Sequence, residues 1–144
     1  MKSTQMIKQT SVVYSFNGRW EDGLVSGAIK VFFRKRRPVK MPSKVFFYIG
    51  TPVKKVIGFA EVTRIEPVDL EMASKIKRSG AITENELISY IGSEGSVNAV
   101  WIAKPVIFPE PFTLTDLNER YNFHPPQSFS NVTGEFEKYL LGTA

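Results

Sequence analysis

The sequence predicts one α+β domain over residues 1–144, on three observations. Segments with the two-residue alternation of β-strands follow one another closely between residues 11 and 65. The stretch from about 69 to 91 instead carries helical spacing and capping residues. Strands and helices do not alternate regularly enough for a doubly wound parallel sheet. A chain of 144 residues also buries roughly 68–70% of the surface that it exposes when unfolded, so its hydrophobic core needs no disulfide bonds for stability.

The expected strands of the first half are rich in β-branched and aromatic residues. The run 11–16 is the first strand and ends at an Asn-Gly pair. Further strands are expected at 28–34, 44–49 and 55–65. Large apolar residues occupy both faces of these strands, which indicates cover on both sides of the sheet. Gly58 lies inside the last one and indicates a bend or the close approach of another backbone.

Short helices are expected between and after the strands. Residues 19–26 form a helical turn or two that stops at Gly27. An insertion over about 69–91 contains two short helices. Asp69 is an N-cap for the first, and Thr83 with Glu86 forms the capping box of the second.

The C-terminal third adds another strand and a final helix. A strand is expected at 97–108, with Pro105 bending it or placing it at a sheet edge. Thr113 or Thr115 caps a turn of helix, and residues of about 133–141 form an amphipathic helix. Five or so strands with hairpin-like spacing therefore indicate a small mixed barrel or sheet.

The composition excludes several kinds of site. Cysteine is absent, so disulfides and thiolate metal sites are excluded. The single histidine, His124, rules out a site with two or more imidazoles, and we expect no metal and no cofactor. The N-terminus lacks a signal-peptide core, and no apolar run is long enough for a membrane helix, so we expect a cytoplasmic protein. The net charge of +5 favours a polyanionic partner.

The middle of the chain resembles a known family. Residues 24–38 (LVSGAIKVFFRKRRP), 45–49 and 51–62, followed later by 125–129 (PPQSF), are similar in order and pattern to the ASCH branch of the PUA-like superfamily. The resemblance covers about 20–65 and 123–141 and is strongest to archaeal members with no assigned function. It implies a small β-barrel with peripheral helices and a cleft that holds RNA, a modified base or a nucleotide. We therefore expect a binding module rather than an enzyme, with RNA or a nucleotide as its ligand.

A dense basic run follows the strand at 28–34. Cationic side chains at a strand end make a compact phosphate site, and each contact releases counterions. The candidates for this role are Arg34, Lys35, Arg36, Arg37, Lys40, Lys54 and Lys55. If the strands pair as a hairpin, Lys54 and Lys55 lie at the same end as this basic run. The alternative is a solvated loop whose charges keep a strand edge from aggregating.

Aromatic and amide side chains are the candidates for contact with a base. Trp20, Tyr48 and Trp101 have polar edges that favour a partly wet position in a cleft. Gln127 and Ser128 follow a rigid Pro-Pro pair and have groups that can read a base edge. Packing is the alternative role for the aromatic residues, and hydrogen bonding to backbone groups is the alternative for Gln127 and Ser128.

Two other functions stay open. Some ASCH proteins are small amidohydrolases with a catalytic lysine and a catalytic acid. When their motif is aligned with this sequence without gaps, these two positions carry Ile29 and Phe32, so the resemblance does not imply that activity here. A small hydrolase acting on a nucleoside derivative would instead use Lys30 and Glu61, with Glu61 partly buried. A protein–protein adaptor is the third possibility, which a strongly apolar surface patch would favour. The sequence leaves the oligomeric state open.

Overall fold

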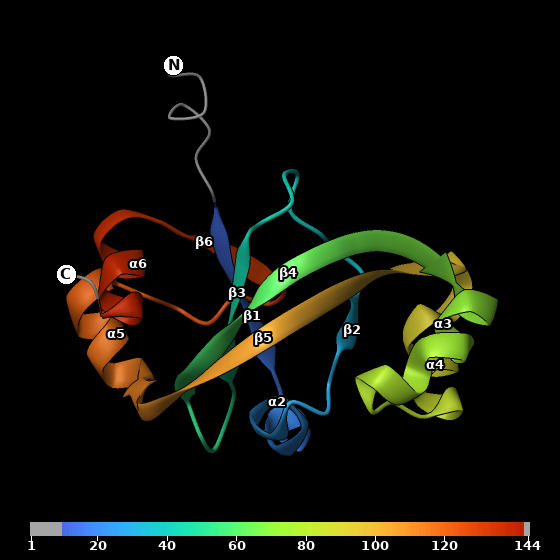
Figure 1. The fold of residues 1–144 in the computed structure, drawn as a ribbon, viewed down its shortest axis with the longest axis horizontal. Helices are drawn as coiled ribbons and strands as arrows, with labels where there is room; N and C mark the ends of the chain where they lie inside the picture. The colour runs from blue at the N-terminus through green and yellow to red at the C-terminus, as the bar shows by residue number, and fades with distance from the viewer. Residues whose placement is uncertain (1–9, 143–144) are drawn as a thin grey trace.

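A computed structural model describes residues 10–142 of the chain. Its six strands form one mixed sheet in the order β2-β5-β4-β3-β1-β6 (Figure 1). The strands are β1 (Ser11–Phe16), β2 (Val31–Arg34), β3 (Lys44–Ile49), β4 (Lys55–Asp69), β5 (Ser96–Thr113) and β6 (Phe129–Val132). β1 and β3 are parallel, and the other neighbours are antiparallel.

The insertion helices lie at one end of the long β4–β5 ribbon and the C-terminal helices at the other, and the short α2 (Glu21–Ser26) lies between these two ends (Figure 1). The other α-helices are α3 (Leu70–Ile76), α4 (Glu84–Ile91), α5 (Leu114–Tyr121) and α6 (Gly134–Leu141). Short 3₁₀ turns are η1 (Gly18–Trp20), η2 (Lys77–Gly80) and η3 (Gly92–Glu94). None of the helices in residues 10–142 has the length and apolar character needed to cross a membrane.

The local signals in the sequence produce these helices as expected. The side chain of Asp69 accepts a hydrogen bond from the Met72 amide, and Thr83 and Glu86 form both bonds of the capping box. Thr113, rather than Thr115, caps α5. Gly27 ends α2 in the left-handed region, at φ 80°. Each cap satisfies backbone groups that a helix end leaves without a partner.

The sheet is covered on both faces, as the apolar residues on both sides of the strands predict. Tyr14 and Phe47 belong to an inner core between the curled strands. Val13 and Phe46, on the opposite face, pack against α5 and α6. A third cluster joins Val31 of β2 and neighbouring strand residues to the insertion helices. The α3–α4 insertion is thereby anchored beside β2.

Gly58 lies where β4 and β5 approach closely. A Cβ atom there would come within 2.3 Å of the Val106 carbonyl oxygen and 3.0 Å of Ile107 Cα. The register between the two strands also shifts between Val56 and Gly58. Bulges of this kind bend and twist a strand pair, and here they curl the long ribbon.

The expected α+β class is confirmed, but the expected small β-barrel is not, because the sheet does not close. β2 and β6 are the outer strands of the sheet, and no ladder joins them within residues 10–142. Both are only four residues long. The segment before β6 contains Pro125 and Pro126, which have no amide hydrogen to donate to a ladder. The sheet therefore curls without closing and leaves an open seam between β2 and the β1–β6 pair.

Candidate functional site

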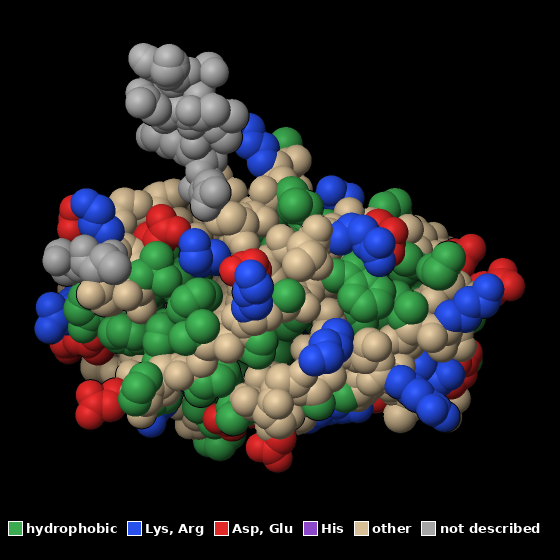
Figure 2. Space-filling model, in the orientation of Figure 1, with side chains coloured by type: hydrophobic (Ala, Val, Ile, Leu, Met, Phe, Trp, Pro, Cys, Tyr) green, Lys and Arg blue, Asp and Glu red, His purple; other side chains and the backbone are tan. Residues whose placement is uncertain are grey.

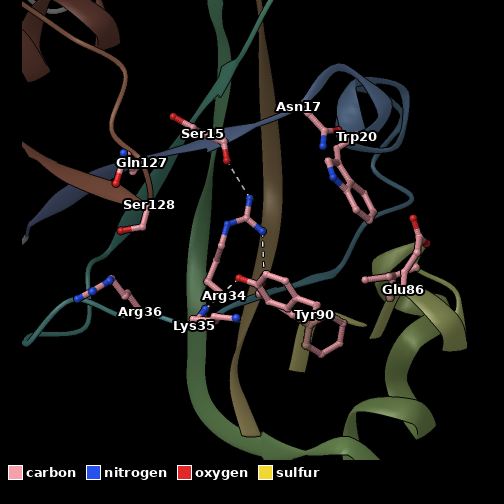
Figure 3. Close-up of a pocket in the computed structure, with 12 residues that line it drawn as sticks. Ser15, Asn17, Trp20, Arg34, Lys35, Arg36, Glu86, Tyr90, Gln127 and Ser128 are labelled. Atoms are coloured by element: carbon pink, nitrogen blue, oxygen red, sulfur yellow. Dashed lines mark hydrogen bonds between the residues drawn. The ribbon is translucent and has the colours of Figure 1, made fainter. Parts of the chain in front are cut away.

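A pocket of about 650 Å³ lies at this open seam, and we call it the seam pocket. Its walls come from the end of β1 and η1, the end of β2, helix α4 and the segment before β6 (Figure 3). Six residues that the sequence singled out line it: Trp20, Arg34, Lys35, Arg36, Gln127 and Ser128. The sequence did not single out the other six as site residues: Ser15, Asn17, Phe33, Ile82, Glu86 and Tyr90.

Arg34 is the innermost cation of the seam pocket. Strand alternation puts Arg34 on the same face of β2 as Phe32. Its Nη2 atom donates to the Ser15 carbonyl and its Nη1 atom to the Phe33 carbonyl, both at 2.9 Å. The guanidinium carbon lies 4.6 Å from the centre of the Phe16 ring, with two further rings within 6 Å. These contacts fix the group in one orientation.

The charge of Arg34 has no acidic partner among the described residues. No carboxylate in residues 10–142 lies within 4.0 Å of its nitrogens. Burial lowers the pKa of Arg34 from its ordinary value, but a guanidinium stays protonated at neutral pH. A half-buried positive charge without a counter-ion is partly desolvated at a cost, and an anionic ligand in the pocket would offset that cost.

Lys35 and Arg36 lie at the mouth of the seam pocket, where both are exposed. The Lys35 amide donates to the Tyr90 hydroxyl at 3.0 Å, and the Lys35 ammonium lies 5.4 Å from the centre of the Tyr90 ring. The Arg36 carbonyl accepts a hydrogen bond from the Tyr14 hydroxyl at 3.2 Å. The backbone of this basic segment is therefore held in place while its charged side chains face solvent and the pocket.

Burial raises the pKa of Tyr14 to about 12, so its hydroxyl stays a neutral donor at physiological pH. Tyr14 thus supports the basic segment from inside the core without adding a charge beside Arg34.

An ion pair joins η1 to α4 across another side of the pocket. Arg19 Nη2 lies 2.6 Å from Glu86 Oε1, and the Arg19 guanidinium carbon lies 3.9 Å from the centre of the Trp20 ring. The hydrogen bond from the Thr83 backbone, and then Arg19, hold the pKa of Glu86 below its usual range. Glu86 and Tyr90 are four residues apart on α4, so they share one helix face. The spacing could therefore indicate a shared face, but not that this face lies at the pocket.

Backbone contacts to Ser15 position the segment before β6. The Ser15 hydroxyl donates to the Pro126 carbonyl at 2.7 Å, and the Ser15 amide donates to the Ser128 carbonyl at 3.4 Å. The side chains of Gln127 and Ser128 have no hydrogen bond to any other of the residues 10–142. Their polar groups line the pocket and are available to a ligand.

Tyr48 and Trp101 do not line the seam pocket. Tyr48 is 3% exposed and packs against Phe123 on the α5–α6 side of the sheet, so its expected place in a cleft is wrong. β3 is a central strand covered on both faces, which leaves no wet position for the ring. Trp101, on β5, is half-buried, and its Nε1 atom donates to Glu66 at 3.3 Å.

The other predicted cations lie outside the seam pocket. Arg37 and Lys40 are exposed in the loop that leads into β3. Lys54 and Lys55 do not lie at the same end as the basic run, so the position expected from a hairpin is wrong. Arg34 pairs with Asn98 near the start of β5, and Lys55 pairs with Thr113 at the end of β5. The reason is topological: β2 reaches the start of β3 through a long loop, whereas the β3–β4 hairpin turns at its end.

The two groups of the hydrolase hypothesis are also outside the pocket lining. Lys30 is exposed, and its Nζ atom donates to the Gly27 carbonyl at 3.0 Å. Glu61 is exposed rather than partly buried, and its carboxylate lies 3.9 Å from the Lys104 ammonium. Across residues 10–142, no three of the His, Asp and Glu side chains come together in a group that could hold a metal ion.

A sequence relative identifies the family. No protein-family model matches the chain. A Zymomonas mobilis protein called "ASCH domain-containing ribonuclease" is 30% identical over 143 residues, which is 96% of this chain and 95% of that protein. The chain therefore belongs to the ASCH family, a branch of the PUA-like superfamily. The archaeal origin expected from the sequence stays a prediction.

Solved structures agree with this assignment. The crystal structure of the Zymomonas mobilis ASCH protein has a TM-score of 0.84, with 30% sequence identity over 92% of this chain and 94% of that one. The N-terminal domain of Staphylothermus marinus McrB has a TM-score of 0.61 at 9% identity over 96% of this chain and 99% of that one, which shows a shared fold.

Proposed function

We propose that this protein binds single-stranded RNA in the seam pocket. The observation that carries the proposal is the half-buried guanidinium of Arg34, which lines a pocket of nucleotide size and has no acidic partner in residues 10–142. A phosphate is the anion that matches a guanidinium best, because its oxygens accept two parallel hydrogen bonds. The Zymomonas mobilis relative is called a ribonuclease, and this supports RNA as the source of the phosphate.

The rest of the pocket suits one nucleotide of a flexible strand. Trp20 and Tyr90 present aromatic rings for a base, and Gln127 and Ser128 have amide and hydroxyl groups for its edge (Figure 3). Lys35 and Arg36 at the mouth are placed to contact neighbouring phosphates. In duplex RNA the bases are paired and stacked, so they are not free to enter such a pocket.

The test is the fluorescence anisotropy of labelled single-stranded RNA, duplex RNA and duplex DNA at low and moderate salt. We expect tighter binding of single-stranded RNA, with an affinity that falls as salt rises. Replacing Lys35 and Arg36 by alanine should reduce the slope of log K against log salt by about 1.4, since each lost contact to a single strand removes about 0.7.

A matched control separates the pocket from the rest of the basic loop. Alanine at both Arg37 and Lys40 removes the same charge from the same loop, outside the pocket lining. A larger loss for the Lys35/Arg36 pair supports the seam pocket. An equal loss for both pairs would support a diffuse basic loop instead, and no binding above that of an unrelated basic protein would overturn RNA binding.

A second candidate function is RNA cleavage in the same pocket, favoured by the name of the Zymomonas mobilis relative. The pocket holds the Ser128 and Tyr90 hydroxyls and the Lys35 ammonium, which are groups that donate or accept protons. Incubation with end-labelled RNA tests it. Cleavage that disappears in Ser128→Ala but persists in Ser130→Ala would assign the reaction to the pocket, whereas intact RNA would leave binding as the function.

The hydrolase hypothesis with Lys30 and Glu61 gains no support from the positions of these residues. The adaptor hypothesis has a surface to consider, because hydrophobic side chains gather near α5 and the adjoining end of β5 (Figure 2). Phe108 and Phe112 are half-buried there, and Val106 is exposed. Nothing in residues 10–142 indicates what would cover this surface.

A further inference from the structure

The three cations of the seam pocket lie at two depths. Arg34 is half-buried and is held by two backbone carbonyls, whereas Lys35 and Arg36 are exposed at the mouth. A phosphate bound at the surface meets Lys35 and Arg36 first. It reaches Arg34 only if it passes the mouth and enters the pocket.

Protein atoms limit the approach to Arg34. The rings of Tyr14, Phe16 and Phe32 lie around its guanidinium, and the Ser15 and Phe33 carbonyls each accept one of its hydrogens. A guanidinium has five N–H donors, so three are left for a ligand. Approach from the pocket side is therefore the route to this group.

The walls of the pocket restrict what can enter. Gln127 and Ser128 lie on one side of Arg34, and Tyr90 and Glu86 on α4 lie on the other (Figure 3). A phosphate inside an RNA chain carries a nucleoside on each of two ester oxygens, and both would have to turn within a pocket of about 650 Å³. A phosphate at the end of a chain carries a single nucleoside and can enter with its free oxygens leading.

Charge favours the same ligand. A terminal phosphomonoester carries about −1.5 to −2 charges at pH 7 and has three free oxygens. An internal phosphodiester has one charge and two free oxygens. In a partly desolvated site, each additional charge and hydrogen bond contributes more binding free energy than it would in water. The unpaired guanidinium of Arg34 therefore gains more from the end of a strand than from its middle.

We propose that the seam pocket recognises a phosphorylated end of single-stranded RNA. The terminal phosphomonoester binds Arg34, its nucleoside lies beside Trp20 and Tyr90, and the next phosphates contact Lys35 and Arg36. This inference rests on the proposed RNA binding and narrows it to a chemical class of strand end. Both 5′-phosphate and 3′-phosphate ends have this chemistry, and the experiment distinguishes them.

The test compares three short single-stranded RNAs of one sequence, each with a fluorophore on an internal nucleotide so that both ends stay free. One carries a 5′-phosphate, one a 3′-phosphate, and one has hydroxyls at both ends. We expect about tenfold tighter binding of one phosphorylated RNA than of the hydroxyl-ended RNA, the effect of about one charge-assisted hydrogen bond. Equal affinities for all three would overturn end recognition but leave RNA binding intact. Absence of binding for all three would overturn the proposed function itself.

Two further measurements locate the effect. Arg34→Lys should abolish the preference for the phosphorylated end, because an ammonium cannot reproduce the fixed, forked donors of the guanidinium. Arg37→Lys makes the same change outside the pocket lining and should keep the preference. Competition on the unsubstituted protein avoids any folding defect: a nucleoside monophosphate should displace the RNA at concentrations where the nucleoside does not. Equal displacement by the two would overturn the proposal.

Discussion

The guanidinium of Arg34 donates a 2.9 Å hydrogen bond to the carbonyl of Ser15, across the seam where β2 and β1 share no ladder. The Arg34 side chain thus donates to a backbone carbonyl that would accept a hydrogen bond from a neighbouring strand in a closed barrel. The same side chain lines the pocket. Arg34 therefore links the stability of the curled sheet to the charge of the candidate binding site.

Arg34→Met should lower both stability and RNA affinity. The change leaves the Ser15 and Phe33 carbonyls without their Arg34 donors. We expect a decrease of about 2 kcal/mol in the free energy of unfolding, within the range for unsatisfied buried groups. Urea denaturation measures it, with the exposed Arg37→Met as the control. Equal stability of the two variants would contradict a structural role for Arg34 at the seam.

Glu86→Gln should tighten RNA binding. The change removes a negative charge from the pocket wall and frees Arg19, while glutamine still forms the capping box with Thr83. We expect affinity to rise about two- to fivefold at low salt, and less at high salt because of screening. Glu84→Gln is the matched control, since Glu84 lies on the same helix, pairs with Lys77 and is outside the seam pocket. Unchanged affinity in Glu86→Gln would show that the Arg19–Glu86 ion pair has no influence on RNA binding.

Gly58→Ala should destabilise the fold. The new Cβ atom would meet the Val106 carbonyl at 2.3 Å, and backbone on both sides of the contact would have to shift. Overpacking of this kind costs about 1–3 kcal/mol. Gly18→Ala is the control, because a Cβ atom at that position would have nothing within 4 Å and the φ of Gly18 is not positive. The midpoints of thermal unfolding compare the two, and a Gly58→Ala variant as stable as Gly18→Ala would show that β4 and β5 separate freely.

Asp116 should contribute to the loss of stability in acid. Its carboxylate accepts hydrogen bonds from the Tyr139 hydroxyl at 2.7 Å and from Arg120 Nε at 2.8 Å, joining α5 to α6. The Tyr139 bond, and then Arg120, hold the pKa of Asp116 below its ordinary value. Its stabilisation is therefore present above about pH 4, the pKa of an unfolded aspartate, and is lost as the pH falls through the lower folded pKa.

The Asp116→Asn variant tests this pH dependence of stability. The variant should be less stable than the unsubstituted protein at neutral pH, and the difference should shrink in acid below about pH 4. Urea midpoints across this range measure it. Glu119→Gln, an exposed change on the same helix, should follow the unsubstituted protein at every pH. A constant difference across the range would show that the Asp116 contacts do not depend on its charge.

Local patterns were enough to place most elements of this fold. The β-branched and aromatic residues of 11–16 and the alternation in 44–49 predicted both strands with their bounds, and the caps at Asp69 and Thr83 predicted the insertion helices. β6 was not predicted, because four residues without alternation become a strand only through pairing with β1. Barrel closure failed for the same reason, since it depends on which distant strands meet.

The candidate site could be predicted only in part. Arg34 and its basic neighbours stand out as a charge cluster in the sequence. Tyr48 was chosen by the same argument as Trp20, and only the position of β3 between two covered faces separates them. Glu86 and Tyr90 were missed as pocket residues, because the folding of the insertion against β2 is a tertiary contact that no local pattern contains.

The open seam also affects how the candidate site can change during evolution. In a closed barrel, the strands around a central cavity are tied to one another by backbone hydrogen bonds, so a change of cavity shape strains the whole ring. Here most of the pocket lining comes from loops, helix faces and strand ends. Substitutions at the mouth can alter which ligand is held at little cost to the sheet. A fold with such a gap is suited to producing relatives that share a scaffold and differ in what they recognise.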